Sequence, residues 1–240
     1  MTTTTLIETV RVRNGEVPLW YLHLRRLVGS CRALGVPIPI ELIAPTGGND
    51  RVHRLLVSRR GMTAGERPVG STAPVRLVTA KARHKPYPHK TLDRVPFDRA
   101  LEEARGAGVD DAVLLTAGGY VAESAIWSIF WWDGARLGAP ALDMGVLPGV
   151  ARARLEELAG EIDQQKVRPA ELAGRSLFVA NAARGGGAGG GVGRRRGAGG
   201  GGNRRPGRTV LALTRRPAKG YFCRLAQGAG NPRGGCSSIG

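Results

Sequence analysis

"PYPHKTLDR", at residues 86–94, places a single lysine, Lys90, just after two prolines and a histidine. Proline lacks a backbone N–H donor and restricts the residue before it, so this segment can neither continue a helix nor pair freely as a central strand. Lysine side chains are mostly solvated, and the default assignment for Lys90 is a surface charge. The segments around it decide whether that default holds.

The residues before this segment predict a small α/β unit. Residues 6–13 are rich in β-branched side chains and precede an Asn-Gly pair, which is a strong hairpin signal. Residues 20–34 place apolar side chains at helical spacing, and a glycine and a proline follow that end the helix. We also expect a second helix at residues 51–61 and a strand at residues 74–82.

The residues after it predict a second, larger unit. Residues 95–108 and 147–161 have the periodicity of amphipathic helices. We expect strands at residues 111–116, 120–124 and 128–134, and a further strand with its exit loop at residues 175–184. The chain is therefore expected to have a small α/β domain at residues 1–83 and a larger domain at residues 84–184.

Residues 185–240 differ from the rest of the chain. They contain 19 of the 37 glycines and 11 of the 36 basic residues but no Asp or Glu, so residues 1–184 carry only +6 of the formal charge of +17. Such a segment cannot bury enough apolar surface to offset the entropy lost on ordering, and we expect it to be disordered. This composition is also typical of a GC-rich gene read out of frame, so a shifted reading frame after about residue 185 is a second hypothesis.

Composition argues against several classes of function. Cys31, Cys223 and Cys236 form no CxxC pair and the four histidines have no metal-ligand spacing, so we expect no metal site and a reducing compartment. The N-terminus lacks the pattern of a signal peptide, and the most apolar stretch, residues 125–132, is too short to cross a bilayer. We therefore expect a cytoplasmic protein without membrane contact.

No aromatic residue lies between positions 185 and 220, so we do not expect specific nucleic-acid binding despite the basic tail.

Several short motifs occur in one particular order along residues 6–184. They are "ETVRVRNG", "HLRRL", "HKTLDR", "DDAVLLTAGGYVAES", "LPGVAR" and "LFVANAAR". In their order and approximate spacing they resemble the class IV aminotransferase family, which includes branched-chain and D-amino-acid transaminases and aminodeoxychorismate lyase. The resemblance implies an α/β (α+β) fold of type IV, with a small N-terminal α/β domain and a larger pseudo-barrel domain. The C-terminal part of that larger domain is degenerate here, because the Gly/Arg tail replaces the expected strand and helix.

The resemblance also implies pyridoxal 5'-phosphate as the cofactor. Lys90 matches the family's catalytic lysine, which forms a Schiff base with the cofactor and needs a lowered pKa to do so. Glu123 matches the carboxylate that pairs with the pyridine nitrogen. Arg26 matches the phosphate-binding arginine, and the amides of Val150 and Ala151 lie at a predicted helix N-terminus, which is a natural anion site.

One more residue is assigned by the resemblance, and three positions differ from the family pattern. Leu147 matches the residue that packs on the ring. The family often has a hydroxyl residue where Ala151 stands and another near Ala182, so two phosphate hydrogen bonds are missing. Ser128 replaces the usual asparagine five residues after Glu123.

Within the family the "HKTLDR" segment resembles the lyases more than the transaminases. It resembles the HKT-x-x-R pattern of enzymes that release pyruvate from 4-amino-4-deoxychorismate and leave 4-aminobenzoate for folate biosynthesis. Branched-chain enzymes more often have an Asn-Tyr pair where Asp93 and Arg94 stand. The alternatives are a branched-chain or D-amino-acid aminotransferase, or, outside the class, an inactive remnant whose tail binds polyanions. The resemblance further implies a homodimer that acts on a small-molecule amino substrate.

Overall fold

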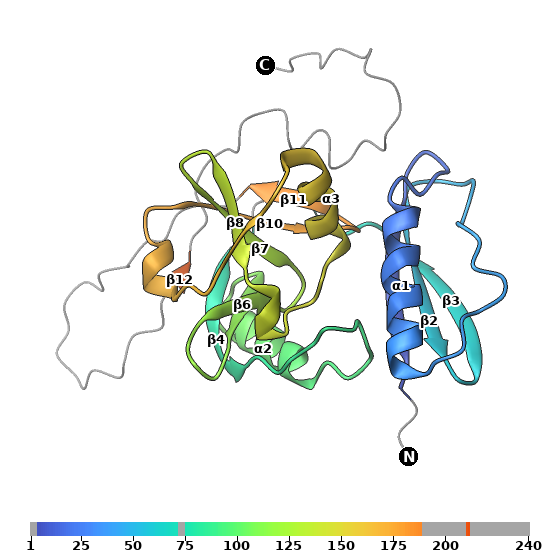
Figure 1. Ribbon diagram of the computed structural model, residues 1–240, viewed down its shortest axis with the longest axis horizontal. Coiled ribbons are helices and arrows are strands. Elements are labelled where there is room, and N and C mark those ends of the chain that lie inside the picture. Colours follow the sequence, from blue (N-terminus) through green and yellow to red (C-terminus); the bar gives the residue numbers. More distant parts are fainter. Residues whose placement is uncertain (1–3, 72–74, 189–209, 212–240) are drawn as a thin grey trace, which may run out of the picture.

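Three antiparallel strands and one helix make up the N-terminal part of the protein, seen on the right of the computed structural model in Figure 1. The structure describes residues 4–71, 75–188 and 210–211. The N-terminal strands pair in chain order and α1 packs on them; they are β1 (Leu6–Val12), α1 (Trp20–Leu34), β2 (Arg51–Ser58) and β3 (Gly61–Arg67). The strand and the first helix expected from the sequence are both present.

The helix predicted at residues 51–61 is wrong, because these residues form β2 and the turn into β3. Val52, Leu55 and Leu56 have helical spacing, which misled the prediction. In the structure β2 pairs with the whole length of β1, and Val52 and Val57 are completely buried. Pairing with a distant strand outweighs a local pattern of this length, because strand formation depends on cross-strand packing.

The described residues of the larger part form two sheets and two α-helices. One sheet has the order β12-β4-β5-β6, with β4 and β5 parallel and joined through α2. The other has the order β11-β10-β7-β8-β9. The elements are β4 (Leu77–Arg83), α2 (Val95–Gly106), β5 (Asp111–Leu115), β6 (Val121–Ser124), β7 (Ser128–Asp133), β8 (Arg136–Pro140), α3 (Val150–Ala159), β9 (Asp163–Gln165), β10 (Ser176–Asn181), β11 (Gly185–Ala188) and β12 (Val210–Leu211), with short 3-10 turns at Leu142–Met144 and Pro169–Leu172. The strands and helices predicted for this part are present, although most of the predicted ranges extend slightly beyond the ends of the observed elements, and β8 and β9 are additional.

Two short strands lie in the segment that we expected to be disordered. Residues 185–188 form β11 on β10, and residues 210–211 form β12 on β4. The prediction of disorder is wrong for these two stretches, because backbone hydrogen bonds to an existing sheet edge need no side-chain pattern. The rest of the predicted disordered tail lies outside the described residues.

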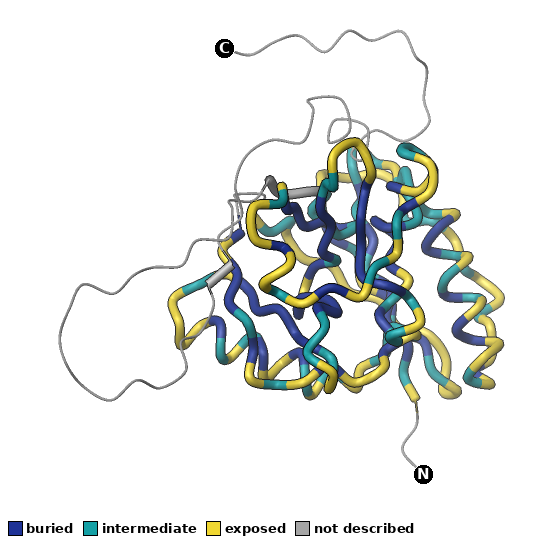
Figure 2. Tube along the Cα trace, turned by 60° about the vertical axis from the view of Figure 1, so that its left-hand side comes forward, coloured by how far each residue is buried: buried dark blue, intermediate teal, exposed yellow. Residues whose placement is uncertain are grey.

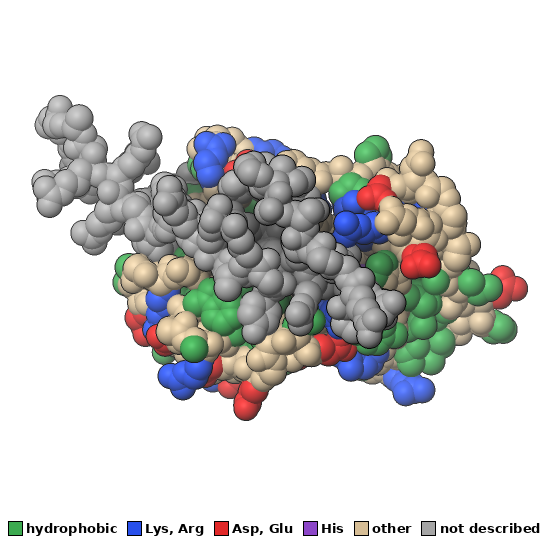
Figure 3. Space-filling view, turned by 90° about the horizontal axis from the view of Figure 1, so that it is seen from above, with side chains coloured by type: hydrophobic (Ala, Val, Ile, Leu, Met, Phe, Trp, Pro, Cys, Tyr) green, Lys and Arg blue, Asp and Glu red, His purple; other side chains and the backbone are tan. Residues whose placement is uncertain are grey.

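Burial follows the strands of the larger part and one side of α1, as Figure 2 shows. The main core lies between the two sheets and includes Trp127, Trp131 and Leu177. On the part of the surface drawn in colour in Figure 3, basic and acidic side chains are interspersed, as is usual for a solvated surface. None of the helices in the described ranges has both the length and the apolar composition needed to span a bilayer.

The pair of Trp131 on β7 and Gly138 on β8 generates a stability prediction. The two residues are direct cross-strand partners, and a Cβ on Gly138 would lie 2.6 Å from the indole Cε2 of Trp131. We expect Gly138→Ala to lower the free energy of unfolding by about 1–3 kcal/mol through overpacking. Gly106 in α2 has nothing within 4 Å of the same added atom, so Gly106→Ala should raise stability by about 0.5–1 kcal/mol. Urea unfolding of both variants checks this, and equal stability of the two would contradict it.

Candidate active site

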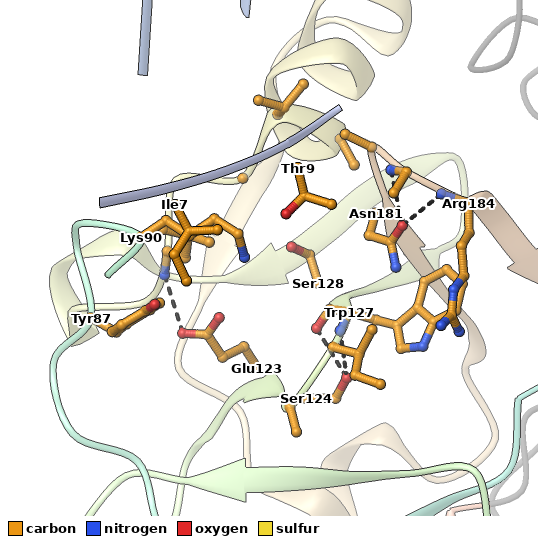
Figure 4. Close-up of a pocket in the computed structure, with 18 of the residues that line it drawn as sticks. Ile7, Thr9, Tyr87, Lys90, Glu123, Ser124, Trp127, Ser128, Asn181 and Arg184 are labelled. Atoms are coloured by element: carbon orange, nitrogen blue, oxygen red, sulfur yellow. Dashed lines mark hydrogen bonds between the residues drawn. The ribbon is translucent and has the colours of Figure 1, made fainter. Parts of the chain in front are cut away.

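A cavity of about 220 Å³ lies where the N-terminal part meets the larger part, and Figure 4 shows its lining. The N-terminal part contributes side chains from β1, α1, β2 and β3, and the larger part contributes the segment around Lys90, the end of β6, the start of α3 and the turn after β10. All six residues assigned from the family resemblance line it, namely Arg26, Lys90, Glu123, Leu147, Val150 and Ala151. The structure thus brings together residues that are up to 125 positions apart in the chain.

Backbone hydrogen bonds place the segment that carries Lys90. The carbonyl of Lys90 accepts from the amide of Ile7 at 2.7 Å, and the amide of Leu92 donates to the carbonyl of Thr5 at 2.9 Å. The segment therefore covers the edge of β1 at its first residues. A proline-containing stretch is well suited to this position, because Pro is tolerated at sheet edges but not in central strands.

The same segment is held on its other side by Gly145. The amide of Tyr87 donates to the carbonyl of Gly145 at 2.6 Å. Gly145 has a φ of +75°, and a Cβ there would lie 2.9 Å from the Cα of Pro86. The Tyr87 hydroxyl in turn donates to the carbonyl of Thr91 and accepts from its amide at 2.7 Å. Lys90 is therefore fixed by contacts on both sides of its loop.

The Lys90 side chain is half-buried and points into the cavity (Figure 4). Loss of hydration, followed by the charges of Arg26 and Arg94, lowers the pKa of Lys90 to about 7, while Glu8 and Glu123 oppose this shift. A lysine with such a pKa is largely uncharged just above neutral pH. An uncharged amine is the form that attacks carbonyl carbons and accepts protons.

Glu123 lies at the end of β6, is buried, and lines the cavity (Figure 4). Its Oε1 accepts from the backbone amide of Leu147 at 3.2 Å and lies 3.0 Å from Nε2 of His84. A carboxylate can only accept, so Nε2 is the donor. With Oε1 held by two donors, Oε2 is the oxygen available to a cationic group in the cavity.

His84 is a residue of this site that sequence reasoning missed. The sequence gives it no metal-ligand spacing and no other role, yet its buried ring packs edge-on against Phe97, with ring centroids 6.1 Å apart, and reaches Glu123. Its position six residues before Lys90, at the end of β4, is the only signal in the sequence that could have pointed to it.

Arg26 is fixed at the cavity by a buried ion pair with Glu8 on β1. The Nε and one terminal nitrogen of Arg26 donate to the two oxygens of Glu8 at 2.8 and 2.6 Å, and Nδ1 of His23 lies 2.7 Å from the same carboxylate. Burial works to raise the pKa of Glu8, but the charge of Arg26 and the hydrogen bonds from His23 and Arg26 outweigh it and hold that pKa at about 2. Glu8 and His23 were not recognised from the sequence.

The start of α3 contributes backbone amides to the cavity. Gly149 is the N-cap, and its carbonyl accepts the first bond of the helix from Ala153 at 3.0 Å. The amides of Val150 and Ala151 precede that bond and have no acceptor within the helix. Gly149 also lies close to Ser128, because an added Cβ would be 3.0 Å from the Ser128 hydroxyl. This end of the cavity suits an anion.

The charge of the lining is strongly positive. Among the described lining residues, Glu123 is the one carboxylate, whereas the basic side chains are Arg26, Arg54, Arg67, Lys90, Arg94 and Arg184. Arg54, Arg67 and Arg184 were not assigned from the sequence. In the described ranges there is no group of three or more His, Cys, Asp or Glu that could hold a metal ion. The cavity can therefore hold a molecule with more than one negative group.

The setting of Lys90 generates a prediction about its titration. Arg94 donates to the carbonyl of Ala125 at 2.6 Å, and its guanidinium lies 4.8 Å from the centre of the Phe97 ring. Removing this nearby cation should favour protonation of Lys90, so we expect Arg94→Met to raise the pKa of Lys90 above 7 by roughly one pH unit. Reductive methylation with labelled formaldehyde, followed by NMR titration of the modified lysine, measures it.

The matched control for that titration is Arg99→Met, which removes an equal charge from the exposed face of α2. It should leave the Lys90 titration unchanged. A Lys90 pKa that falls, or stays the same, in Arg94→Met would show that the cavity cations do not set it.

Known proteins with similar structures include both aminotransferases and lyases. A protein from Mesorhizobium loti, assigned as an amino-acid aminotransferase, is 27% identical, with a TM-score of 0.67 over 77% of this chain and 97% of its own. A protein from Legionella pneumophila, assigned as a 4-amino-4-deoxychorismate lyase, is 21% identical, with a TM-score of 0.65 over 76% and 81%. The branched-chain aminotransferase of Thermoproteus uzoniensis is 21% identical, with a TM-score of 0.67 over 93% and 83%. The last two show the fold alone.

The sequence itself identifies the family. No curated protein matches it, but residues 50–187 match the profile described as amino-transferase class IV. The matched segment is more than half of the 240 residues and includes Lys90, Glu123 and the start of α3. The chain therefore belongs to the class IV aminotransferase family, a family of pyridoxal-phosphate-dependent enzymes.

Proposed function

We propose that this protein binds pyridoxal 5'-phosphate through Lys90 and releases pyruvate from 4-amino-4-deoxychorismate to form 4-aminobenzoate. The observation that carries the proposal is the arrangement in one cavity of an amine with a lowered pKa, a buried carboxylate and the N-terminus of a helix. A branched-chain or D-amino-acid aminotransferase is the alternative. The similar structures include both kinds of enzyme.

The described residues fit this cofactor. The amides of Val150 and Ala151, with Arg26 beside them, would hold the phosphate, and the half-buried Leu147 would lie against the ring. Oε2 of Glu123 would accept from the pyridine nitrogen, since Oε1 is occupied. When bound, the cofactor supplies an electron sink for negative charge at the carbon next to the substrate amine. The hydroxyl groups missing at Ala151 and Ala182 lower the number of phosphate hydrogen bonds.

The reaction needs one residue that both receives and returns a proton. Lys90 would hold the cofactor in the free enzyme, and with substrate bound its uncharged amine would take the proton from the carbon that bears the substrate amine. The C–O bond between the substrate's six-membered ring and its enolpyruvyl group then breaks, and the substrate ring becomes aromatic. Lys90 can return its proton to the departing enolpyruvate to give pyruvate. The step requires no oxidant or reductant.

Other parts of the proposal rest on the family. We infer a homodimer, a cytoplasmic location, and a small domain at residues 1–83 followed by a larger one at residues 84–184. The opposing hypothesis, an inactive remnant that binds polyanions through its tail, predicts no bound cofactor. Spectroscopy separates these two hypotheses.

Lys90 gives the most direct prediction. Wild-type protein mixed with pyridoxal phosphate should show a visible absorbance band that disappears on borohydride reduction, with the label on Lys90 in peptide maps. Lys90→Ala should lack the band, whereas Lys85→Ala, which removes an exposed lysine nearby, should keep it. Label spread over many lysines, or no band in the wild type, would support the inactive remnant.

Product analysis separates the lyase from the aminotransferase. With 4-amino-4-deoxychorismate we expect equal amounts of 4-aminobenzoate and pyruvate, and Lys90→Ala should lower the rate by at least about a thousandfold, because proton transfer is lost. Leucine with 2-oxoglutarate should give little glutamate. Faster amino-group exchange than pyruvate release would assign the chain to the aminotransferases.

A further inference from the structure

Arg184 is held on the side of the cavity opposite Lys90 (Figure 4). It ends the turn that follows β10, and this turn is fixed by the Asn181 side chain, whose Oδ1 accepts from the amides of Ala183 and Arg184 at 3.1 and 2.8 Å. Arg11 also donates to the carbonyl of Ala183 at 3.3 Å. The backbone position of Arg184 is therefore set by three hydrogen bonds.

The guanidinium of Arg184 lies close to Trp127 and Gly70. Its central carbon lies 5.5 Å from the centre of the buried Trp127 ring. A Cβ on Gly70 would lie 2.7–2.8 Å from three guanidinium atoms. The guanidinium thus lies close to both an indole and a residue without a side chain. Stacking of this kind restricts the rotation of an arginine and leaves the N–H groups at its edge for an acceptor.

No acceptor in the described part of the chain is paired with this guanidinium. Loss of hydration, and then the charge of Arg67, lowers the pKa of Arg184, whereas Asp111 opposes the shift. Arg67 lines the same cavity, and its positive charge disfavours the charged form of Arg184. A partly buried cation in this setting gains most from an anionic ligand, since charge-assisted pairs are strong where water is scarce.

We propose that Arg184 binds a carboxylate of the substrate that is remote from its amine, and so selects amino substrates with a second acidic group over those with apolar side chains. This inference rests on the proposed function and makes its substrate class specific. A planar guanidinium can donate two parallel hydrogen bonds to a carboxylate. An apolar substrate would leave it desolvated and unpaired, and sites built for a polar group reject analogues that lack it.

Binding of a matched pair of acids tests the proposal. Glutarate and valerate have the same chain length but two and one carboxylates, and each is titrated calorimetrically into protein loaded with pyridoxal phosphate. We expect the wild type to bind glutarate more tightly by roughly ten- to a hundredfold. Arg184→Gln should abolish the preference while the cofactor absorbance band and cofactor affinity persist, and Gly70→Ala should weaken it by displacing the guanidinium.

The same titrations distinguish carboxylate binding by Arg184 from phosphate binding by this side chain. Arg99→Gln, the loss of an exposed charge, should keep the full preference. If Arg184→Gln weakens cofactor binding and leaves the preference unchanged, Arg184 binds the cofactor phosphate and the proposal is wrong. Equal binding of both acids by the wild type also overturns it. Absence of the cofactor absorbance band in the wild type would instead refute the proposed function. This absorbance is measured independently of the ratio of glutarate to valerate affinity.

Discussion

Two backbone hydrogen bonds join the Lys90 segment to β1 and to the residue just before it, and these are the contacts on which the site depends. They join Ile7 to Lys90 and Thr5 to Leu92, and so bring the three-stranded sheet against the larger part of the protein. The cavity exists because these two parts meet, and it draws on side chains from both. Without this docking, Arg26 and Glu8 would be separated from Lys90 and Glu123, and no combination of residues on one part alone would form the site.

Electrostatic balance is the second constraint. Basic groups outnumber acidic ones along the cavity lining, and two buried carboxylates, Glu8 and Glu123, compensate part of that charge. Glu8 does so by pairing with Arg26. The pair fixes the position of Arg26, whose positive charge still lowers the pKa of Lys90. Loss of hydration lowers the pKa of Lys90 most, and the positive charge of the lining lowers it further. That same positive charge makes the cavity receptive to anions, so the reactivity of Lys90 and the ligand preference share one contribution.

Much of the fold and part of the site could be predicted from the sequence. The positions of Lys90, Glu123 and the start of α3 follow from short motifs, because each is a local pattern of a few residues. The strand β2 could not be predicted, because its apolar spacing is helical and only pairing with β1 decides its structure. His84, Glu8 and Arg184 were missed for a related reason: each contacts its partner across a gap in sequence, and nothing in the local pattern reveals that partner.

The contact between Gly145 and Pro86 has a consequence for how such sequences are interpreted across genomes. Neither residue touches the cavity, yet their close approach positions the loop that presents Lys90. A side chain at position 145 would move that loop while every recognisable motif stayed intact. Homologues that keep the lysine but have lost this glycine would pass a motif search and lack a correctly placed amine. A glycine at position 145 together with the lysine is therefore a better indicator of an intact site than the presence of the lysine alone.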